Sequence, residues 1–321
     1  MIWLPFICLG IGAVLGFRNL SVRVINAVDF TTNITLILLM FTIGANIGIN
    51  DSLIGSLGTI GFRCVMIATL AIACSVICTM ILEKTLLPLE SVGKKICQEH
   101  LKVNKEVSNV QEEKRGSSPL IWIIPVSIVF GVLIGYVVIP MNMTYILDYS
   151  LIGSLILLYI SVGIGLGTHR RVFKYVQILG WKIILISLAI FIGSLIGGFL
   201  AGILLGMPIH ISTMSAIGMS YYSLTGAYLT QIYGIEAGTY GFIVNVLREF
   251  ITLLTLPLLV KISKGSSIAA GAAGDMDTML VPITKFIGKE LGLVTLITGT
   301  ILTFAVPLLL PLFTHIFFLI L

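Results

Sequence analysis

Long apolar runs dominate the chain and set its expected architecture. Eight such runs lie near residues 2–17, 32–50, 59–82, 119–139, 147–167, 178–205, 236–260 and 290–320. About 18 or more consecutive apolar residues are enough to cross the hydrocarbon core of a bilayer as a helix. The pattern therefore predicts an all-α polytopic membrane protein with about eight transmembrane helices.

Two further stretches, 207–233 and 265–288, mix apolar residues with Gly, Ser, Thr and other polar residues. They are too mixed for ordinary spans. Within a membrane, unwound backbone is tolerated only where it is buried or lines a water-filled cavity. We therefore expect two broken or re-entrant segments, and the residues leave open whether these are hairpins or crossing half-helices.

The composition agrees with this pattern. Of the 321 residues, 57% are hydrophobic and only 10% are charged, whereas a typical soluble domain carries about 25% charged residues. This deficit excludes an ordinary cytosolic enzyme, a nucleic-acid-binding protein and a disordered chain. The one long polar segment, 84–118, is expected to be a cytoplasmic linker.

An internal repeat appears when the chain is shifted by 119 positions. The matched positions are Ile2-Trp3 with Ile121-Trp122, Asp29 with Asp148, and Gly12, Gly16, Gly44, Gly48 and Gly61 with Gly131, Gly135, Gly163, Gly167 and Gly180. The predicted organisation is a first three-span repeat (1–83), the linker (84–118), a second, inverted three-span repeat (119–205) and a transport core (206–321).

The basic residues test the inversion. A copy with three spans reverses the orientation of the copy that follows, and cytoplasmic loops are enriched in Lys and Arg. Arg18 and Arg23 follow the first span, while the charged loop of the second copy (Arg170, Arg171, Lys174) follows its middle span. With both termini outside, 16 of the 19 basic residues fall on the cytoplasmic side.

Acidic residues inside these apolar surroundings are the first candidates for function, because intramembrane ionisable groups are costly and usually functional. Asp277, with Asp275 beside it, lies in the second mixed stretch, and Asp51 follows Asn46 at the end of the second span. Simple roles as loop or helix-capping acids remain open for Asp51 and Asp277.

Arg248 and Glu249 lie in the middle of the seventh span. Adjacent residues do not face each other on a helix, so each is expected to have another partner. For Arg248, a structural clamp on a hairpin carbonyl or carboxylate and a direct substrate contact are both open. The uncharged candidates for hydrogen bonds to an ammonium or carboxylate group are Tyr222, Ser223, Thr225, Gln231 and Asn245.

At these positions the chain resembles the LysO family of prokaryotic lysine exporters. The motifs that carry the resemblance are Tyr222-Ser223-Leu224-Thr225-Gly226, Leu229-Thr230, Asn245-x2-Arg248-Glu249 and Met276-Asp277-Thr278 with Leu280. The resemblance implies export of L-lysine, resistance to the toxic analogue thialysine, and eight spans in the inner membrane with both termini outside.

The resemblance also implies that two intramembrane aspartates are required for export, and by motif they fall on Asp51 and Asp277. Some relatives consist of two chains, with a break that would lie in the 84–118 linker. This sequence departs from the family pattern at Tyr221 (usually Trp), at Asp275 (usually Ser) and at the displaced Pro282. The additional carboxylate of Asp275 leaves substrate preference and charge stoichiometry open.

Together these features predict a secondary transporter, not an enzyme, that exports L-lysine by alternating access and cation-coupled antiport. Asp51 and Asp277 are expected to hold the cationic substrate or the coupling ion, a proton in the first instance, with Na⁺ left open. No metal or other cofactor is expected. The expected partners are L-lysine and the lipid bilayer, without nucleic acid, and a homodimer is left open.

Three alternatives remain. A carrier for another amino acid or a carboxylate is the first; if its substrate is anionic, it should place basic residues at its site, and only Arg248 qualifies. An intramembrane aspartyl protease is indicated weakly by Gly274-Asp275, since position 272 is Ala and Asp148 is followed by a tyrosine instead of preceded by one. A non-transporting assembly or sensor protein is the third.

Overall fold

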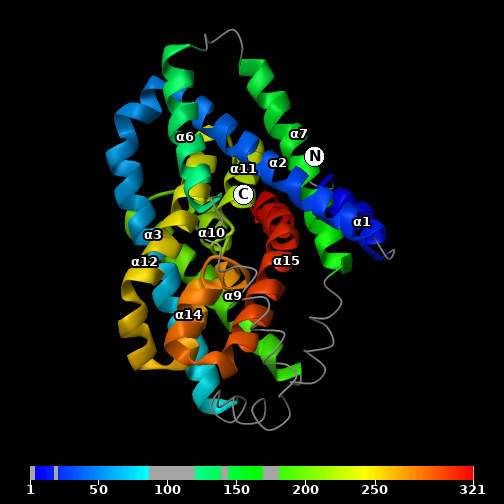
Figure 1. The fold of residues 1–321 in the computed structure, drawn as a ribbon. Coiled ribbons are helices and arrows are strands. Elements are labelled where there is room, and N and C mark those ends of the chain that lie inside the picture. Colours follow the sequence, from blue (N-terminus) through cyan, green and yellow to red (C-terminus); the bar gives the residue numbers. More distant parts are fainter. Residues whose placement is uncertain (1–3, 18–20, 87–119, 139–143, 169–180, 321) are drawn as a thin grey trace.

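The computed structural model describes residues 4–17, 21–86, 120–138, 144–168 and 181–320, and within them the only regular elements are helices (Figure 1). This confirms the predicted all-α polytopic membrane class. In the described part of the chain, six helices are long and apolar enough to cross a membrane: Arg23–Ile49, Gly58–Thr85, Tyr145–Gly165, Ile184–Leu205, Ile235–Ile262 and Leu291–Leu319. Two shorter apolar helices cover Pro5–Phe17 and Val126–Val137.

The eight long elements follow the predicted runs. They are α1 (Leu4–Phe17), α2 (Val22–Ile49), α3 (Asp51–Thr85), α6 (Leu120–Val137), α7 (Thr144–Thr168), η2 (Trp181–Ile183) continuing into α9 (Ile184–Leu205), α12 (Ile235–Ile262) and α15 (Lys289–Ile320). Helix α2 begins about ten residues before the predicted run at residue 32. In these polar first turns the hydroxyls of Thr31 and Thr32 donate to the backbone carbonyls of Ala27 and Val28, four residues earlier.

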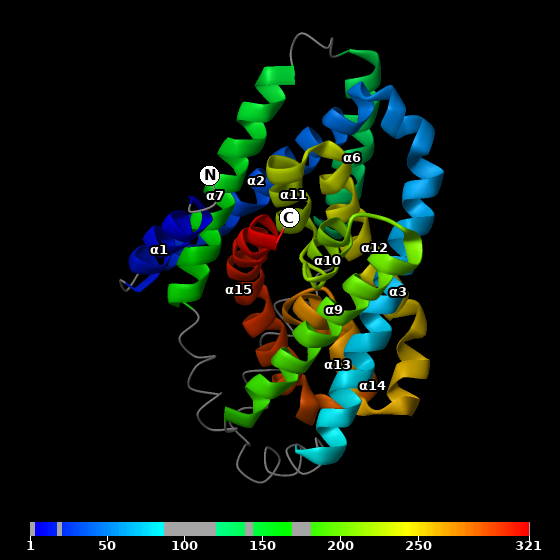
Figure 2. The ribbon, with the colours of Figure 1, turned by 180° about the vertical axis from the view of Figure 1, so that it is seen from behind.

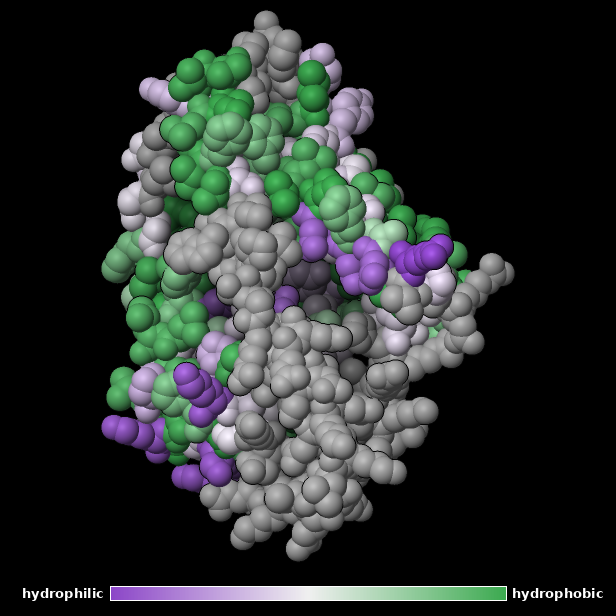
Figure 3. Space-filling model, in the orientation of Figure 1, coloured by the Kyte–Doolittle hydropathy of each residue, from purple (hydrophilic) through white to green (hydrophobic). Residues whose placement is uncertain are grey.

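Apolar side chains cover much of the outer surface (Figure 3). Leu254 is 80% exposed, Val129 60% and Phe130 56%. An exposed apolar surface of this extent is costly in water and favourable against lipid tails. The long helices therefore have the surface of membrane spans as well as the length.

Both mixed stretches are broken helices. The first consists of α10 (Ile209–Ala216) and α11 (Tyr222–Tyr233), and the second of α13 (Lys264–Gly271), η3 (Ala272–Met276) and α14 (Leu280–Ile287). The breaks contain the non-glycine residues with positive φ, namely Met219 (49°), Ser220 (75°) and Ala272 (53°). Such backbone is strained and concentrates at functional sites.

Each broken segment reverses its direction at the break and so has the shape of a hairpin, and its re-entry into the membrane stays a prediction. Helix α10 packs antiparallel to α9, and α11 packs antiparallel to α12 (Figure 2). The α13–α14 segment lies near the opposite side of the molecule, between the end of α12 and the start of α15. The first tip (residues 217–221) and the second tip (residues 272–279) meet in the interior, where the Ala273 N–H donates to the Met219 carbonyl over 2.9 Å.

The helices of the two proposed repeats pair reciprocally. Helix α1 packs along α7, α6 along α2, and α3 along α9. Glycines allow these backbones to touch, since a Cβ on Gly12 would collide with the backbone at Gly163, and one on Gly44 with the backbone at Ile128. A twofold relation between two three-helix copies would give this pairing, and the inverted repeat itself stays a prediction.

Several predictions of topology lie outside the described residues. These are the linker beyond residue 86, Arg18, and the loop that carries Arg170, Arg171 and Lys174. The assignment of the termini to the outer face and the proposed domain boundaries therefore also stay predictions.

Candidate functional site

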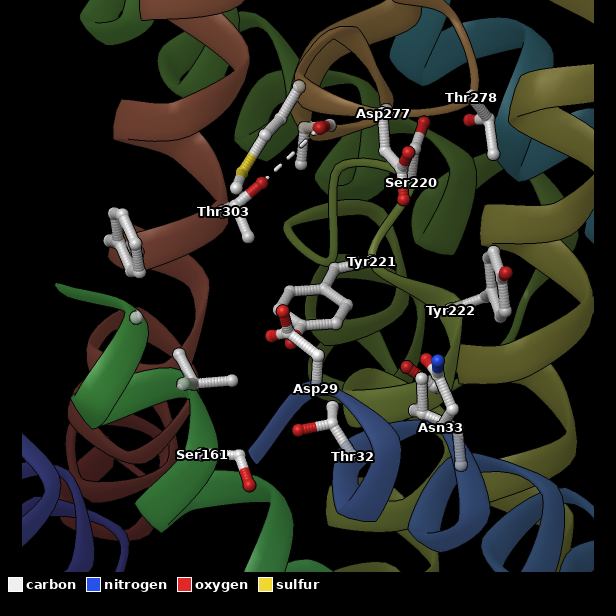
Figure 4. A pocket seen from close by; sticks show the side chains of 18 of the residues that line it. Asp29, Thr32, Asn33, Ser161, Ser220, Tyr221, Tyr222, Asp277, Thr278 and Thr303 are labelled. Atoms are coloured by element: carbon white, nitrogen blue, oxygen red, sulfur yellow. Dashed lines mark hydrogen bonds between the residues drawn. The ribbon is translucent and has the colours of Figure 1, made fainter. Parts of the chain in front are cut away.

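A cavity of about 700 Å³ lies where the two hairpin tips face helices α2 and α7 (Figure 4). Its wall is built from α2, α7, the first tip, α12, the second tip and α15. The polar residues that line it are Asp29, Thr32, Asn33, Ser161, Thr168, Ser220, Tyr221, Tyr222, Ser223, Glu249, Asp277, Thr278 and Thr303.

The cavity is acidic. Asp29, Glu249 and Asp277 contribute carboxyl groups, and none of the lining residues within the described ranges is Lys, Arg or His. In Figure 4, Asp29 projects from α2 on one side and Asp277 from the second tip on the other. Because charges interact more strongly in a partly dehydrated cavity than in bulk water, this lining favours a cation.

A hydrogen bond links the second tip, which carries Asp277, to the acidic residue Glu249 of α12. The Thr278 hydroxyl donates to the Glu249 carboxylate over 3.1 Å, so Glu249 is held against the tip that carries Asp277. The tip itself is tied to α15, where the Thr303 hydroxyl donates to the Ala273 carbonyl over 3.2 Å. Two of the three cavity carboxyl groups therefore belong to one connected region.

Asn245 holds the first tip from behind. Its Oδ1 accepts the Ser220 N–H over 2.7 Å, and its Nδ2 donates to the Ser215 carbonyl over 2.9 Å and to the Gly241 carbonyl over 2.7 Å. It is fully buried and is not among the cavity lining. The bond to Ser220 stabilises the positive-φ backbone of the tip, the bond to Ser215 ties α10 to it, and the bond to Gly241 stays within α12.

Arg248 holds the second tip, one helical turn further along α12. Its Nε donates to the Ala270 carbonyl over 3.2 Å and its Nη2 to the Ala269 carbonyl over 3.1 Å. Nη1 donates to the Ser194 hydroxyl over 2.8 Å, and Nη2 also donates to the Ser75 hydroxyl over 3.3 Å. Arg248 is 1% exposed and does not line the cavity, so its geometry is that of the structural clamp.

The other candidates take different places. Tyr222 and Ser223 line the cavity at the start of α11. Thr225 is fully buried and donates its hydroxyl to the Tyr221 carbonyl over 2.8 Å. Asp275 is fully buried behind the second tip, outside the cavity lining. Gln231, near the end of α11, is likewise not among the lining residues.

The family-implied Asp51 occupies the first position of α3, and its side chain lies outside the described residues. Nearby Asn46 is 3% exposed and does not line the cavity. Whether Asp51 acts together with Asp277 therefore stays a prediction.

Asp29 was missed as a site residue. It precedes the apolar run at residue 32, and sequence reasoning used it only as a marker of the repeat. A signal was present, because Ile25, Asp29, Thr32, Asn33 and Leu36 follow helical i, i+3, i+4 spacing, and all of them line the cavity. Extending the helix back to residue 22 would have placed Asp29 on the same face as Asn33.

Replacing Asp29 with Asn is expected to weaken binding of a cationic substrate by roughly tenfold, since one charge-assisted hydrogen bond contributes about 1.5 kcal/mol or more. The matched control is Asp148→Asn, which removes an exposed carboxylate outside the cavity lining. Binding of radiolabelled lysine to the purified protein in detergent measures both. Equal affinities for the two variants would show that Asp29 does not contact the substrate.

The fold and the cavity define a polytopic membrane protein in which two broken segments meet at an acidic cavity, an arrangement typical of secondary transporters. The profile of the family "Lysine exporter LysO" matches residues 6–93 and 125–314. The chain belongs to this lysine exporter family, which confirms the family resemblance seen in the sequence.

Two relatives illustrate the similarity. The protein named "Lysine exporter LysO" from Escherichia coli K12 is 29% identical over 161 residues, which make up 50% of this chain and 54% of the relative. The "Putative lysine exporter" of Haemophilus influenzae is 30% identical over 123 residues, 38% of this chain and 63% of the relative. The aligned part of the chain thus spans between half and two thirds of each relative's length.

Proposed function

We propose that this protein exports L-lysine, together with toxic analogues such as thialysine, from the cytoplasm across the inner membrane of a prokaryote. The observation that carries the proposal is the cavity at the hairpin tips, which is lined by Asp29, Glu249 and Asp277 and by no basic residue of the described chain. The printed names of both relatives support lysine as the substrate.

Lysine carries two ammonium groups and one carboxylate, and the cavity offers partners for each. Asp277 and Glu249 lie on the side of the second tip and suit one ammonium group, while Asp29 on α2 suits the other. Charge-assisted hydrogen bonds of this kind are the stronger ones in proteins.

The substrate carboxylate is best accommodated at the start of α11. Tyr222 and Ser223 line the cavity there, and the N-terminus of a helix favours an anion. Ser220 also lines the cavity, and its buried hydroxyl has no hydrogen-bond partner among the described residues. Such a site prefers a cationic amino acid to an anionic carboxylate, which would meet three acidic groups.

The position of the site supports transport by alternating access. The tips belong to the two broken segments, which we expect to enter from opposite sides, whereas α2 and α7 belong to the proposed repeats. Movement of the hairpin region against α2 and α7 would open the cavity to one side at a time. Export also requires an energy source, because an inside-negative potential opposes the exit of a cation by about 2.3 kcal/mol per charge per 100 mV. Antiport with an inward-moving cation supplies it.

The remaining alternatives have less support. A carrier for a carboxylate lacks a basic side chain at the cavity, since Arg248 is engaged behind the second tip. For a protease, Asp275 is fully buried and Asp148 is exposed on α7, and neither lines the cavity. A carrier for another cationic amino acid differs from the proposal only in the substrate.

The test is lysine transport by the purified full chain in liposomes. Efflux of preloaded radiolabelled lysine is expected to exceed that of empty liposomes severalfold, and external lysine and thialysine are expected to compete more strongly than glutamate. If glutamate competes equally or lysine does not move, lysine is not the substrate. Comparison with ornithine and arginine then defines the preference among cationic amino acids.

A further inference from the structure

Asp275 is a buried carboxyl group that the acidic cavity does not use. It lies in η3 at the second tip and is fully buried. Neither of its carboxylate oxygens has a hydrogen-bond partner among the residues that the structure describes. Buried polar groups are nearly always paired, so a carboxyl group without a partner needs an explanation.

Two glycines leave the space that Asp275 occupies. The Gly271 Cα lies so close that a Cβ there would collide with the Asp275 carboxylate. A Cβ on Gly299 of α15 would lie 2.5 Å from the Asp275 carbonyl carbon and 2.8 Å from its Cβ. The side chain is therefore enclosed by α13 and α15, whereas the next two residues, Met276 and Asp277, line the cavity.

The charged neighbours of Asp275 are Arg248 and Glu249, both on α12. The other ionisable residues on the elements that pack around η3 lie toward the far ends of those helices; they are Lys264 on α13, Lys285 on α14, and Lys289, Glu290 and His315 on α15. Glu290, the second residue of α15, lies about 13 Å along the helix from Gly299 at a rise of 1.5 Å per residue. Arg248 is thus the one nearby cation among the described residues.

Arg248 does not hydrogen-bond to Asp275. Its donors go to the carbonyls of Ala269 and Ala270 and to the hydroxyls of Ser75 and Ser194. An ionised carboxylate that is fully buried without a donor is very costly, and a proton is the smallest species that removes its charge.

We propose that Asp275 is a proton-binding site that couples transport to proton movement. In the present conformation the carboxyl group holds its proton. When the second tip turns toward the hydrated cavity, the carboxyl group ionises and its proton passes to water on the side to which the cavity is open. Because Met276 and Asp277 already line the cavity, a small rotation of η3 brings Asp275 to it. This inference rests on the proposed lysine transport.

The test separates proton coupling from substrate movement, using the full chain in liposomes and the variant Asp275→Asn. Exchange of lysine against lysine requires no net proton transfer, and the variant is expected to keep it within about threefold of the parent. Accumulation of lysine driven by an imposed pH gradient is expected to fall at least about tenfold. The control Asp148→Asn is expected to retain both activities.

Three results would overturn the proposal. The first is an Asp275→Asn variant that accumulates lysine from a pH gradient like the parent, and the second is a variant that loses exchange together with accumulation. The third is a parent protein that is driven by a sodium gradient and not by a pH gradient. A parent that exchanges no lysine at all would instead contradict the proposed function.

A second measurement follows proton movement directly. A pH-sensitive dye inside the liposomes should report proton movement opposite to lysine in the parent, and this movement should be lost in Asp275→Ser. Serine is smaller than aspartate and fits the same enclosed space, so this variant serves if Asp275→Asn does not fold. The absence of lysine-dependent proton movement in the parent would contradict the assignment of Asp275.

Discussion

Replacing Asp277 with Asn is expected to reduce lysine export by about 10- to 100-fold. The substitution keeps the shape of the side chain and removes a negative charge from the second tip, where Asp277 lines the cavity. A hydrogen bond to a charged group contributes about 1.5–3 kcal/mol, and 1.4 kcal/mol corresponds to a factor of ten in binding. The measurement is lysine efflux from cells preloaded with a lysine-containing dipeptide, at matched amounts of protein in the membrane.

The family resemblance gives the same expectation for Asp51→Asn. A suitable control is Glu236→Gln, because Glu236 is an exposed acid at the start of α12 outside the cavity lining. The control is expected to export lysine like the parent. Normal export by Asp277→Asn would show that this carboxylate is not needed on the transport path. Loss of export by the control would show that removing any acidic charge impairs export.

The sequence was most informative where hydrophobic pattern alone decides the structure. The long apolar runs become α1, α2, α3, α6, α7, α9, α12 and α15, and the two stretches rich in Gly, Ser and Thr become the broken segments. Bilayer thickness fixes the length of a span, and lipid forbids unpaired backbone, so both features leave a local signature. The predicted start of α2, at residue 32, was wrong because the first turns of this helix are polar and lack the apolar signal.

The sequence was least informative where partners are distant along the chain. Asn245 was a candidate for substrate binding, but its acceptor bond is to the N–H of Ser220, 25 residues away. For Arg248, the hydroxyl partner Ser75 lies 173 residues away. Composition and spacing show that a polar residue is buried in a span, whereas only the packed structure shows whether it faces the cavity or the backbone behind it.

Helix α12 emerges as the element that holds both tips. Asn245 and Arg248 are three residues apart and so lie on one face of this helix. Asn245 bonds to the backbone of the first tip, and Arg248 bonds to the backbone just before the second. Glu249, the next residue, reaches the cavity. A movement of α12 would therefore displace both tips and one cavity carboxyl group together.

Ser75 and Ser194 give this arrangement a connection to both proposed repeats. They are separated by 119 positions, which is the shift of the internal repeat, and their hydroxyls are 3.0 Å apart. Arg248 donates to both. The guanidinium group thus joins equivalent positions of α3 and α9 to the second hairpin, where Ala269 and Ala270 accept from it. If this link is what fixes the hairpin, its loss should affect stability and transport together.

Replacing Arg248 with Lys is therefore expected to destabilise the protein by roughly 2–5 kcal/mol, because a buried donor or acceptor left unpaired costs about 1–3 kcal/mol. Lysine keeps the positive charge, but its single ammonium group cannot reproduce the planar fork of donors that reaches two carbonyls and two hydroxyls. Thermal unfolding in detergent, followed by the loss of the monodisperse peak in size-exclusion chromatography, should show a melting temperature lower by about 5 °C or more. Lysine efflux should fall below about a tenth of the parent rate, which is the effect of about 1.4 kcal/mol on the transport path.

The matched control for this prediction is Arg63→Lys. Arg63 is a partly buried arginine of α3 whose Nη1 donates to the Tyr240 hydroxyl over 3.2 Å, a bond that a lysine can replace. The control is expected to unfold within about 2 °C of the parent and to export lysine normally. If Arg248→Lys matches this control in both measurements, the second tip is held by its packing against α15 and not by the guanidinium group. If Arg248→Lys unfolds normally but fails to export, Arg248 acts in the transport cycle itself, through the hairpin that it binds, and its contribution to the stability of the resting fold is small.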